Sequence, residues 1–295
     1  MEFFEIIDFE IIGYLIGFFI GMVMGLIGGG GSLLLPTLIY LFDIESTLAT
    51  AYTLVLVGVT ALIGVLPRIK SKRVDFPTAI TLGIPILLGT LLVRGWLTHE
   101  LDDFEIGPEG KPIPLVLFEL LGFEFTKRKL VLLVFASVLI ASFASMIGLI
   151  GRNMKARPKL RQESPVFYFS MLIGAGLFIG VLSAFIGAGG GVMIVPLLVI
   201  VMGLPMKTVV GTSLAIMAGK SILGFSGDVF QIGQKIQWDF LGAFAFVMIG
   251  GILVGTYCSK FVSSAKLKTG FAWFILAMAI FIFYKELMLP GVTGK

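Results

Sequence analysis

The apolar residues of this chain fall into stretches of about 20, the length that an α-helix needs to cross the hydrocarbon core of a membrane. Eight such stretches lie at roughly 11–27, 46–66, 74–97, 129–149, 165–187, 206–225, 238–258 and 267–288. Short apolar continuations follow the first and fifth, at 33–42 and 192–203. Hydrophobic residues make up 57% of the chain and charged residues 14%, more apolar surface than one soluble core can bury. We therefore predict an all-α polytopic membrane protein.

The first four stretches resemble the last four in order and in composition. Residues 27–36 and 187–196 each combine a glycine run with a proline, and Pro36 and Pro196 fall in register. The same register aligns Ala51-Tyr52-Thr53-Leu54 with Gly211-Thr212-Ser213-Leu214. A glycine cluster, a proline and a hydroxyl pair repeated in one order indicate an internal duplication, with about four hydrophobic segments per half.

This duplication divides the chain into two repeats and a linker. We place the first membrane repeat at 1–150 and the second at 165–295, joined by a basic linker at 151–164 that should be cytoplasmic. An acidic insertion at 98–126 has no counterpart in the second half, and we place it outside. Within it we expect a short interfacial helix around 112–121.

The direction of the first and fifth segments decides how the repeats are related. If both cross fully, the repeats are parallel; if both turn back at their glycine clusters, the repeats are inverted. Inversion puts the acidic N-terminus outside and places four lysines inside, Lys207, Lys260, Lys266 and Lys268. The parallel arrangement places those four lysines outside the membrane but puts three others inside, Lys235, Lys285 and Lys295. We favour inverted repeats, and the parallel arrangement stays open.

The glycine runs should interrupt the first and fifth segments. Each glycine costs a helix roughly 1 kcal/mol relative to alanine, and broken backbone within a membrane needs protein or a water-filled cavity around it. The short helices that follow would aim unpaired N–H groups and a partial positive charge inward, which suits an anion. The predicted substrate-binding backbone comprises Gly28, Gly29, Gly30, Gly31, Ser32, Gly189, Gly190, Gly191 and Val192, with Pro36 and Pro196 in the helices after the breaks.

The alternative for glycine is tight helix crossing, as small residues permit in membranes. We assign that role to other glycines, namely Gly17, Gly21, Gly25, Gly174, Gly176 and Gly180.

Polar side chains in the following segments could complete the anion site. Thr53, Thr212 and Ser213, with Tyr52, offer hydroxyl donors, although ordinary interhelical hydrogen bonding explains them nearly as well. Lys220 lies within an apolar segment, where a charge is costly and by default functional. Its alternative is a side chain that extends to the headgroups, because the segment ends soon after.

No motif for nucleotide binding, catalysis or metal binding is complete in this sequence. Gly219-Lys220-Ser221 imitates the end of a phosphate-binding loop, but Leu214 stands where that motif requires glycine. The single histidine, His99, and the single cysteine, Cys258, form no catalytic or metal-ligand pattern. We predict no enzyme activity, no cofactor, no metal and no nucleic-acid partner; nothing in the sequence supports an oligomer.

The duplicated pattern of a glycine run, a proline and then Thr212-Ser213-Leu214 resembles the TauE/SafE family of sulfite-exporter-like permeases over nearly the whole chain. The first half departs slightly, with Ala51-Tyr52-Thr53 in place of Gly-Thr-Ser. The resemblance implies a secondary permease for sulfite, an organosulfonate or a similar sulfur-containing anion, in a prokaryotic-type plasma membrane. Its partners would be the anion and membrane lipid. The alternatives are a passive anion channel, or a membrane scaffold that binds partners through 98–126.

Overall fold

The fold is taken from a computed structural model that describes residues 2–42, 44, 46–93, 104–106, 112–114, 116–120, 123–148, 165–186, 191–232 and 236–288. Within these ranges the first half contains α1 (Glu2–Ile27), the 3-10 helix η1 (Gly30–Leu33), α2 (Leu34–Leu41), α3 (Ser46–Lys70), α4 (Phe76–Leu92) and α5 (Lys127–Met146). The second half contains α7 (Pro165–Ile186), α8 (Gly191–Ile200), α9 (Met206–Ile232), α10 (Trp238–Cys258) and α11 (Ser264–Met288). Every predicted hydrophobic segment contains one of these helices, and the basic linker at 151–164 lies outside the described residues.

The insertion at 98–126 contains strands where we expected a helix. Four short strands are described there: β1 (Phe104–Ile106), β2 (Pro112–Pro114), β3 (Val116–Leu120) and β4 (Phe123–Thr126). They form two antiparallel hairpins, β1 with β2 and β3 with β4. The predicted interfacial helix at 112–121 is therefore wrong. Residues 116–120 and 123–126 are rich in aromatic and branched side chains that favour a pleated strand.

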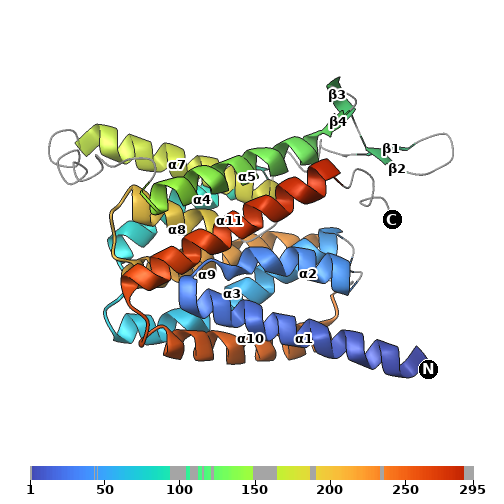
Figure 1. Cartoon of the computed structure of the whole chain (residues 1–295), viewed down its shortest axis with the longest axis horizontal. Helices are drawn as coiled ribbons and strands as arrows, with labels where there is room; N and C mark the ends of the chain where they lie inside the picture. Colours follow the sequence, from blue (N-terminus) through green and yellow to red (C-terminus); the bar gives the residue numbers. More distant parts are fainter. Residues whose placement is uncertain are drawn as a thin grey trace.

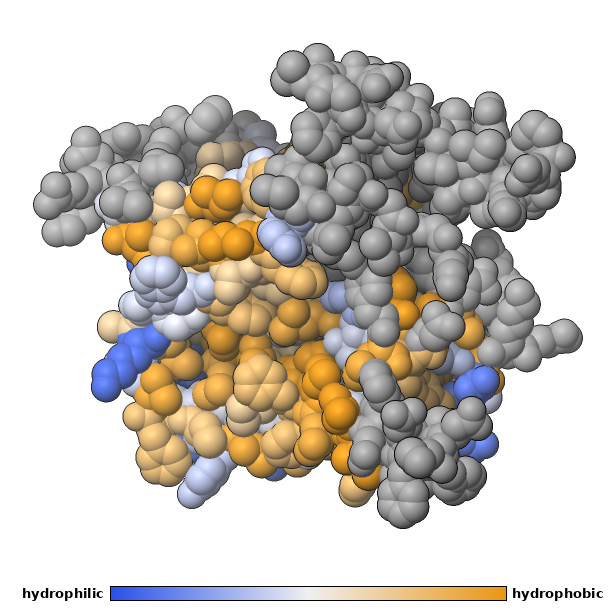
Figure 2. Space-filling view, turned by 45° about the vertical axis from the view of Figure 1, so that its right-hand side comes forward, coloured by the Kyte–Doolittle hydropathy of each residue, from blue (hydrophilic) through white to orange (hydrophobic). Residues whose placement is uncertain are grey.

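The outer surface of the helices is apolar. Within the described part of the chain, four helices have the length and hydropathy of membrane spans, at Leu48–Lys70, Met206–Phe225, Trp238–Cys258 and Ser264–Tyr284. Large apolar side chains point outward from them, including Phe246, which is 78% exposed. Figure 2 shows apolar residues over the middle of one face, with the most hydrophilic ones toward its left and right margins. Because water would not tolerate such a surface, this is an integral membrane protein.

The helices pack in pairs that join the two halves (Figure 1). α1 lies along α10, α4 lies along α7, α3 crosses α9, and α5 lies along α11. If α1 corresponds to α7 and α4 corresponds to α10, the contact of α1 with α10 corresponds to the contact of α7 with α4. The two halves then pack against each other through equivalent pairs of helices.

Glycines allow the closest of these contacts. A Cβ on Gly21 or Gly25 would collide with backbone oxygens of α10, and one on Gly180 would collide with the carbonyl of Ile86 on α4. Gly17 and Gly176 also face neighbouring helices, so their predicted role in helix crossing is confirmed. Gly174 is the exception, because no atom of the described residues lies within 4 Å of its Cβ position and no helix contact supports the prediction for it.

Candidate functional site

The first glycine run interrupts the helix as expected. α1 ends at Ile27, and the N–H of Gly28 donates a hydrogen bond to the carbonyl of Met24 at 2.8 Å. Gly28 adopts φ +76°, the left-handed conformation with which glycine terminates helices. A Cβ there would also lie 2.5 Å from the Ser213 hydroxyl, so this position requires glycine for two independent reasons.

After the break the chain forms η1 and continues into α2, which contains Pro36. Gly30, Gly31 and Ser32 are buried in η1, and the Ser32 hydroxyl lies 3.5 Å from the carbonyl of Gly29. In the second half, α8 begins at Gly191 with Val192 in its first turn and Pro196 inside it. Gly189 and Gly190 lie outside the described residues.

The two breaks meet in the interior of the protein. A Cβ built on Gly191 would lie 3.4 Å from the Cα of Gly29, and one built on Gly29 would lie 3.5 Å from the carbonyl oxygen of Gly191. The backbones of the two halves thus approach each other so closely that a single carbon added to either glycine would be in van der Waals contact with the other. The Phe271 ring of α11 packs on Gly29, 2.8 Å from its Cβ position.

Gly31 in the first break and Gly191 in the second have corresponding neighbours. Gly31 faces Val57 of α3, and Gly191 faces Met217 of α9. A shift of 160 residues carries the first pair onto the second, the same shift that aligns Pro36 with Pro196. The repeat seen in the sequence therefore also appears in the contacts around each break.

The predicted hydroxyl donors lie near the breaks but already have protein partners. Ser213 lies 3.1 Å from both the Gly28 carbonyl and the Val210 carbonyl, so its hydroxyl ties the first break to α9. Thr53 donates to the carbonyl of Ala49 within α3 at 2.8 Å. Both residues are buried. Of the two explanations weighed for Ser213, ordinary interhelical hydrogen bonding is the one these contacts support.

Tyr52 and Thr212 hold the starts of two other helices. The Tyr52 hydroxyl accepts a hydrogen bond from the backbone N–H of Gln237, which precedes α10, at 2.8 Å. The Thr212 hydroxyl accepts one from the N–H of Asp75, which precedes α4, at 3.0 Å. The two arrangements match, because Tyr52 aligns with Thr212 and Asp75 and Gln237 each stand immediately before their helices.

Lys220 is buried rather than extended to the membrane surface. It is only 3% exposed, and its ammonium group hydrogen-bonds the hydroxyl of Ser183 on α7. Ser183 lies one turn before the second glycine run. The alternative of a lysine that reaches the headgroups is therefore wrong, and a cation lies beside the helix that leads into the second break.

Arg68 is a second buried cation, and sequence reasoning assigns it no role in the site. In the sequence it belongs with Lys70, Lys72 and Arg73 to a short basic loop of the kind that indicates membrane orientation. Instead it lies in the last turn of α3, is 3% exposed, and donates to the carbonyl of Gly25 in the last turn of α1. Its position directly after the apolar segment and Pro67 was the available signal.

Comparison with known proteins supports the same family as the sequence motifs. A family model described as sulfite exporter TauE/SafE matches residues 13–282. The match includes both glycine runs, α3, α9 and the two buried cations. No curated protein and no solved structure matches the chain.

Proposed function

Since the chain belongs to the TauE/SafE family of sulfite exporters, a family of transporters rather than enzymes, we propose that it is a secondary permease for sulfite, an organosulfonate or a similar anion. We propose that the anion binds between the halves, at the backbone of Gly28–Ser32 and Gly189–Val192. The observation that carries this proposal is the close approach of Gly29 and Gly191, which brings the two interrupted segments together.

The chemistry of that region suits an anion. The first turns of η1 and α8 begin there, and helix starts present free N–H groups and a partial positive charge. Glycine lets a ligand approach this backbone closely. Lys220, held by Ser183 beside the second run, adds a full positive charge to the same part of the protein.

Binding at this point requires movement. The space between Gly29 and Gly191 admits little more than a single carbon, and Phe271 packs on Gly29, so the anion cannot occupy the space between the breaks in this conformation. We propose that one half moves against the other to admit it, as in alternating access. The extensive contact between α3 and α9 lies at the centre of such a movement.

We also propose that the halves are inverted repeats in a plasma membrane, with several crossings each. Support comes from the basic residues, which gather at one end of the helices. The Lys207 ammonium lies 3.4 Å from the carbonyl of Lys260, and the Arg73 backbone contacts Gly211 of α9. The α3–α4 and α10–α11 connections both lie at the left of Figure 1. An inverted arrangement makes this end cytoplasmic, as the positive-inside rule favours.

Single cysteines at Ile44 and Leu204, in a Cys258→Ser background, test this topology. In inverted repeats the two positions lie on opposite sides, so an impermeant maleimide added outside intact cells should label Ile44→Cys and leave Leu204→Cys unlabelled until the cells are opened. Labelling of both from the same side would mean that the repeats are parallel.

Flux of sulfite into proteoliposomes tests the site. We expect Gly29→Val and Gly191→Val to abolish flux, because the new side chains would collide with the Phe271 ring and the Met217 sulfur and fill the narrow space between the breaks. Gly29 has a negative φ, −137°, so the substitution does not require the left-handed conformation that favours glycine. Lys220→Met should lower flux at least about tenfold by removing the buried charge.

Gly242→Val is the matched control, because Gly242 is an exposed helical glycine with nothing within 4 Å of its Cβ position. Wild-type flux in correctly folded Gly29→Val and Gly191→Val would refute the site. Counterflow of labelled sulfite separates a carrier from a channel, since only a carrier is accelerated by substrate on the far side. Absence of flux from the wild type, with partners retained through 98–126, would favour the scaffold.

A further inference from the structure

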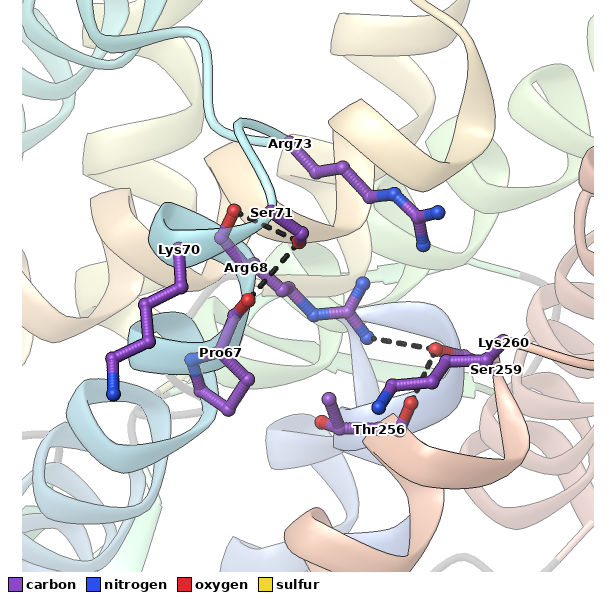
Figure 3. Close-up of a pocket in the computed structure, with 8 residues that line it drawn as sticks. All are labelled: Pro67, Arg68, Lys70, Ser71, Arg73, Thr256, Ser259 and Lys260. Atoms are coloured by element: carbon purple, nitrogen blue, oxygen red, sulfur yellow. Dashed lines mark hydrogen bonds between the residues drawn. The ribbon is translucent and has the colours of Figure 1, made fainter.

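A cavity of about 270 Å³ lies between the ends of α3 and α10, away from the place where the glycine runs approach each other. It is lined by Pro67, Arg68, Lys70, Ser71, Arg73, Thr256, Ser259 and Lys260 (Figure 3). This lining contains four cations and no carboxylate. The volume lies just below the range of roughly 300–1,000 Å³ that is typical for drug-sized ligands, so a small ion with some water fits better.

Three of the cations, Arg68, Arg73 and Lys260, lie around the same space. In Figure 3 the guanidinium group of Arg68 extends toward Ser259 and Lys260, and that of Arg73 lies beside it, whereas Lys70 points away to the other side. Positive charges that lie together in this way repel each other unless an anion lies between them. The cavity is therefore electrostatically suited to a negative ligand.

The guanidinium group of Arg68 is fixed in place by two neighbouring helices. Its Nη2 donates to the carbonyl of Gly25 on α1 and lies 3.4 Å from the hydroxyl of Ser259 at the end of α10. Ser259 in turn donates to the carbonyl of Thr256 at 2.7 Å. A guanidinium held at defined points can recognise an oxyanion with little further loss of side-chain freedom.

Two buried polar atoms of the lining residues, Nε of Arg68 and Oγ1 of Thr256, have no hydrogen-bond partner among the residues that the structure describes. Each such atom costs about 1–3 kcal/mol when left unsatisfied, so buried polar groups are nearly always paired. A role for Arg68 in capping the last turn of α1 accounts for its Nη2 but leaves Nε unexplained. It also does not explain why Arg73 and Lys260 face the same space.

We propose that this cavity is a second anion site, which binds a small oxyanion through Arg68, Arg73 and Lys260. The ligand chemistry is an SO₃, SO₄ or PO₄ group, whether of a free anion or of a lipid headgroup. Its use in transport rests on the proposed function: in the inverted topology the cavity opens at the cytoplasmic end and gathers the exported anion. Binding itself does not depend on that function.

Calorimetric titration of the purified full-length protein in detergent tests the site, at constant ionic strength. Sodium sulfite, sodium sulfate and inorganic phosphate are one set of probes, and dihexanoyl phosphatidylglycerol is the other. We expect saturable binding of at least one probe, and about tenfold weaker binding in Arg73→Gln and in Lys260→Gln, since each loses one charge-assisted contact. Preference for the inorganic anions identifies a free ligand, and preference for the lipid identifies a headgroup.

Lys72→Asn is the matched control. Lys72 belongs to the same basic loop but does not line the cavity, and its φ of 54° is one that asparagine tolerates. Its affinity should stay within about twofold of the wild type. No saturable binding of any probe, or equal weakening in Lys72→Asn, would overturn the proposal. Arg68→Gln is interpreted only together with Arg73→Gln and Lys260→Gln, because replacing Arg68 also removes its hydrogen bond to the carbonyl of Gly25.

The same titration of Gly29→Val separates this inference from the proposed function. Gly29→Val should abolish flux yet keep binding that is sensitive to Arg73→Gln. If the wild type binds the anion but carries no flux, the proposed function fails and the site stands. If Gly29→Val loses the Arg73-sensitive binding, the cavity is not a separate site and the inference fails.

Discussion

Tyr52 in the first half and Thr212 in the second occupy matching positions and accept hydrogen bonds from matching backbone N–H groups, those of Gln237 and Asp75. One side chain is a large phenol and the other a small alcohol. Gly31 against Val57 and Gly191 against Met217 form a second such pair. The comparison teaches that the halves share backbone contacts, while the side chains that make them have diverged.

Buried charge differs more between the halves. Each central helix sends one cation to the helix before a glycine run, Arg68 of α3 to α1 and Lys220 of α9 to α7. They do not match in register, since a shift of 160 residues carries Thr60 onto Lys220. The Thr60 hydroxyl is buried without a hydrogen-bond partner. Charge placement, unlike the backbone contacts, therefore distinguishes one half from the other.

The largest expected effect comes from Gly28→Ala, which removes the left-handed helix end of the first break. The left-handed conformation costs a non-glycine residue roughly 1–2 kcal/mol, and the new Cβ would overlap Ser213, adding roughly 1–3 kcal/mol. We expect a loss of about 2–5 kcal/mol in the free energy of unfolding, measured by titration with a denaturing detergent, together with loss of sulfite flux.

Gly203→Ala supplies the control for backbone strain alone. Gly203 also has a positive φ, 66°, but nothing lies within 4 Å of its Cβ position. It should cost only the roughly 1–2 kcal/mol of the left-handed conformation. Equal losses for the two variants would mean that the approach of α9 to Gly28 contributes nothing to stability.

A smaller effect is expected from Tyr52→Phe and Thr212→Val, which test the matching hydrogen bonds. Each leaves one backbone N–H without its acceptor, at a cost of about 1 kcal/mol in the same titration. Tyr52→Phe keeps the ring stacked on Phe240, so it isolates the hydroxyl. The double variant should lose the sum, about 2 kcal/mol, because the two hydrogen bonds share no residue.

Unequal losses in these two variants would break the comparison between the halves. A loss confined to Thr212→Val would indicate that Asp75 depends on this contact while Gln237 has another acceptor. A double variant far from additive would mean that the starts of α4 and α10 are coupled through the rest of the protein.

Much of the fold could be predicted from the sequence, because hydrophobic segment length and glycine content act locally. The helix boundaries agree with the predicted segments within a few residues for most elements; α1 is the main exception and begins at Glu2. The break at Gly28 followed from the helix cost of consecutive glycines. The hairpins at 104–126 were missed because acidic composition suggested a surface insertion and hid the strand-forming residues between the charges.

The site was less predictable, because hydrogen-bond partners are chosen by the fold. Ser213 was expected to serve an anion, yet its hydroxyl bonds the carbonyl of Gly28, 185 residues away in the chain. Lys220 could be interpreted either way until Ser183 appeared beside it. Gly174 looked like Gly176 and Gly180 in sequence, yet no atom of the described residues lies within 4 Å of its Cβ position.

The sequence by itself determined that this is a membrane protein, where most of its helices begin and end, and that glycine interrupts the first segment. These properties depend on neighbouring residues, through backbone conformation and transfer to lipid. Only the tertiary structure decided that the two breaks lie close together, that Arg68 and Lys220 are buried, and that three cations line one cavity. Those results depend on helix packing, which brings together residues that no local pattern relates.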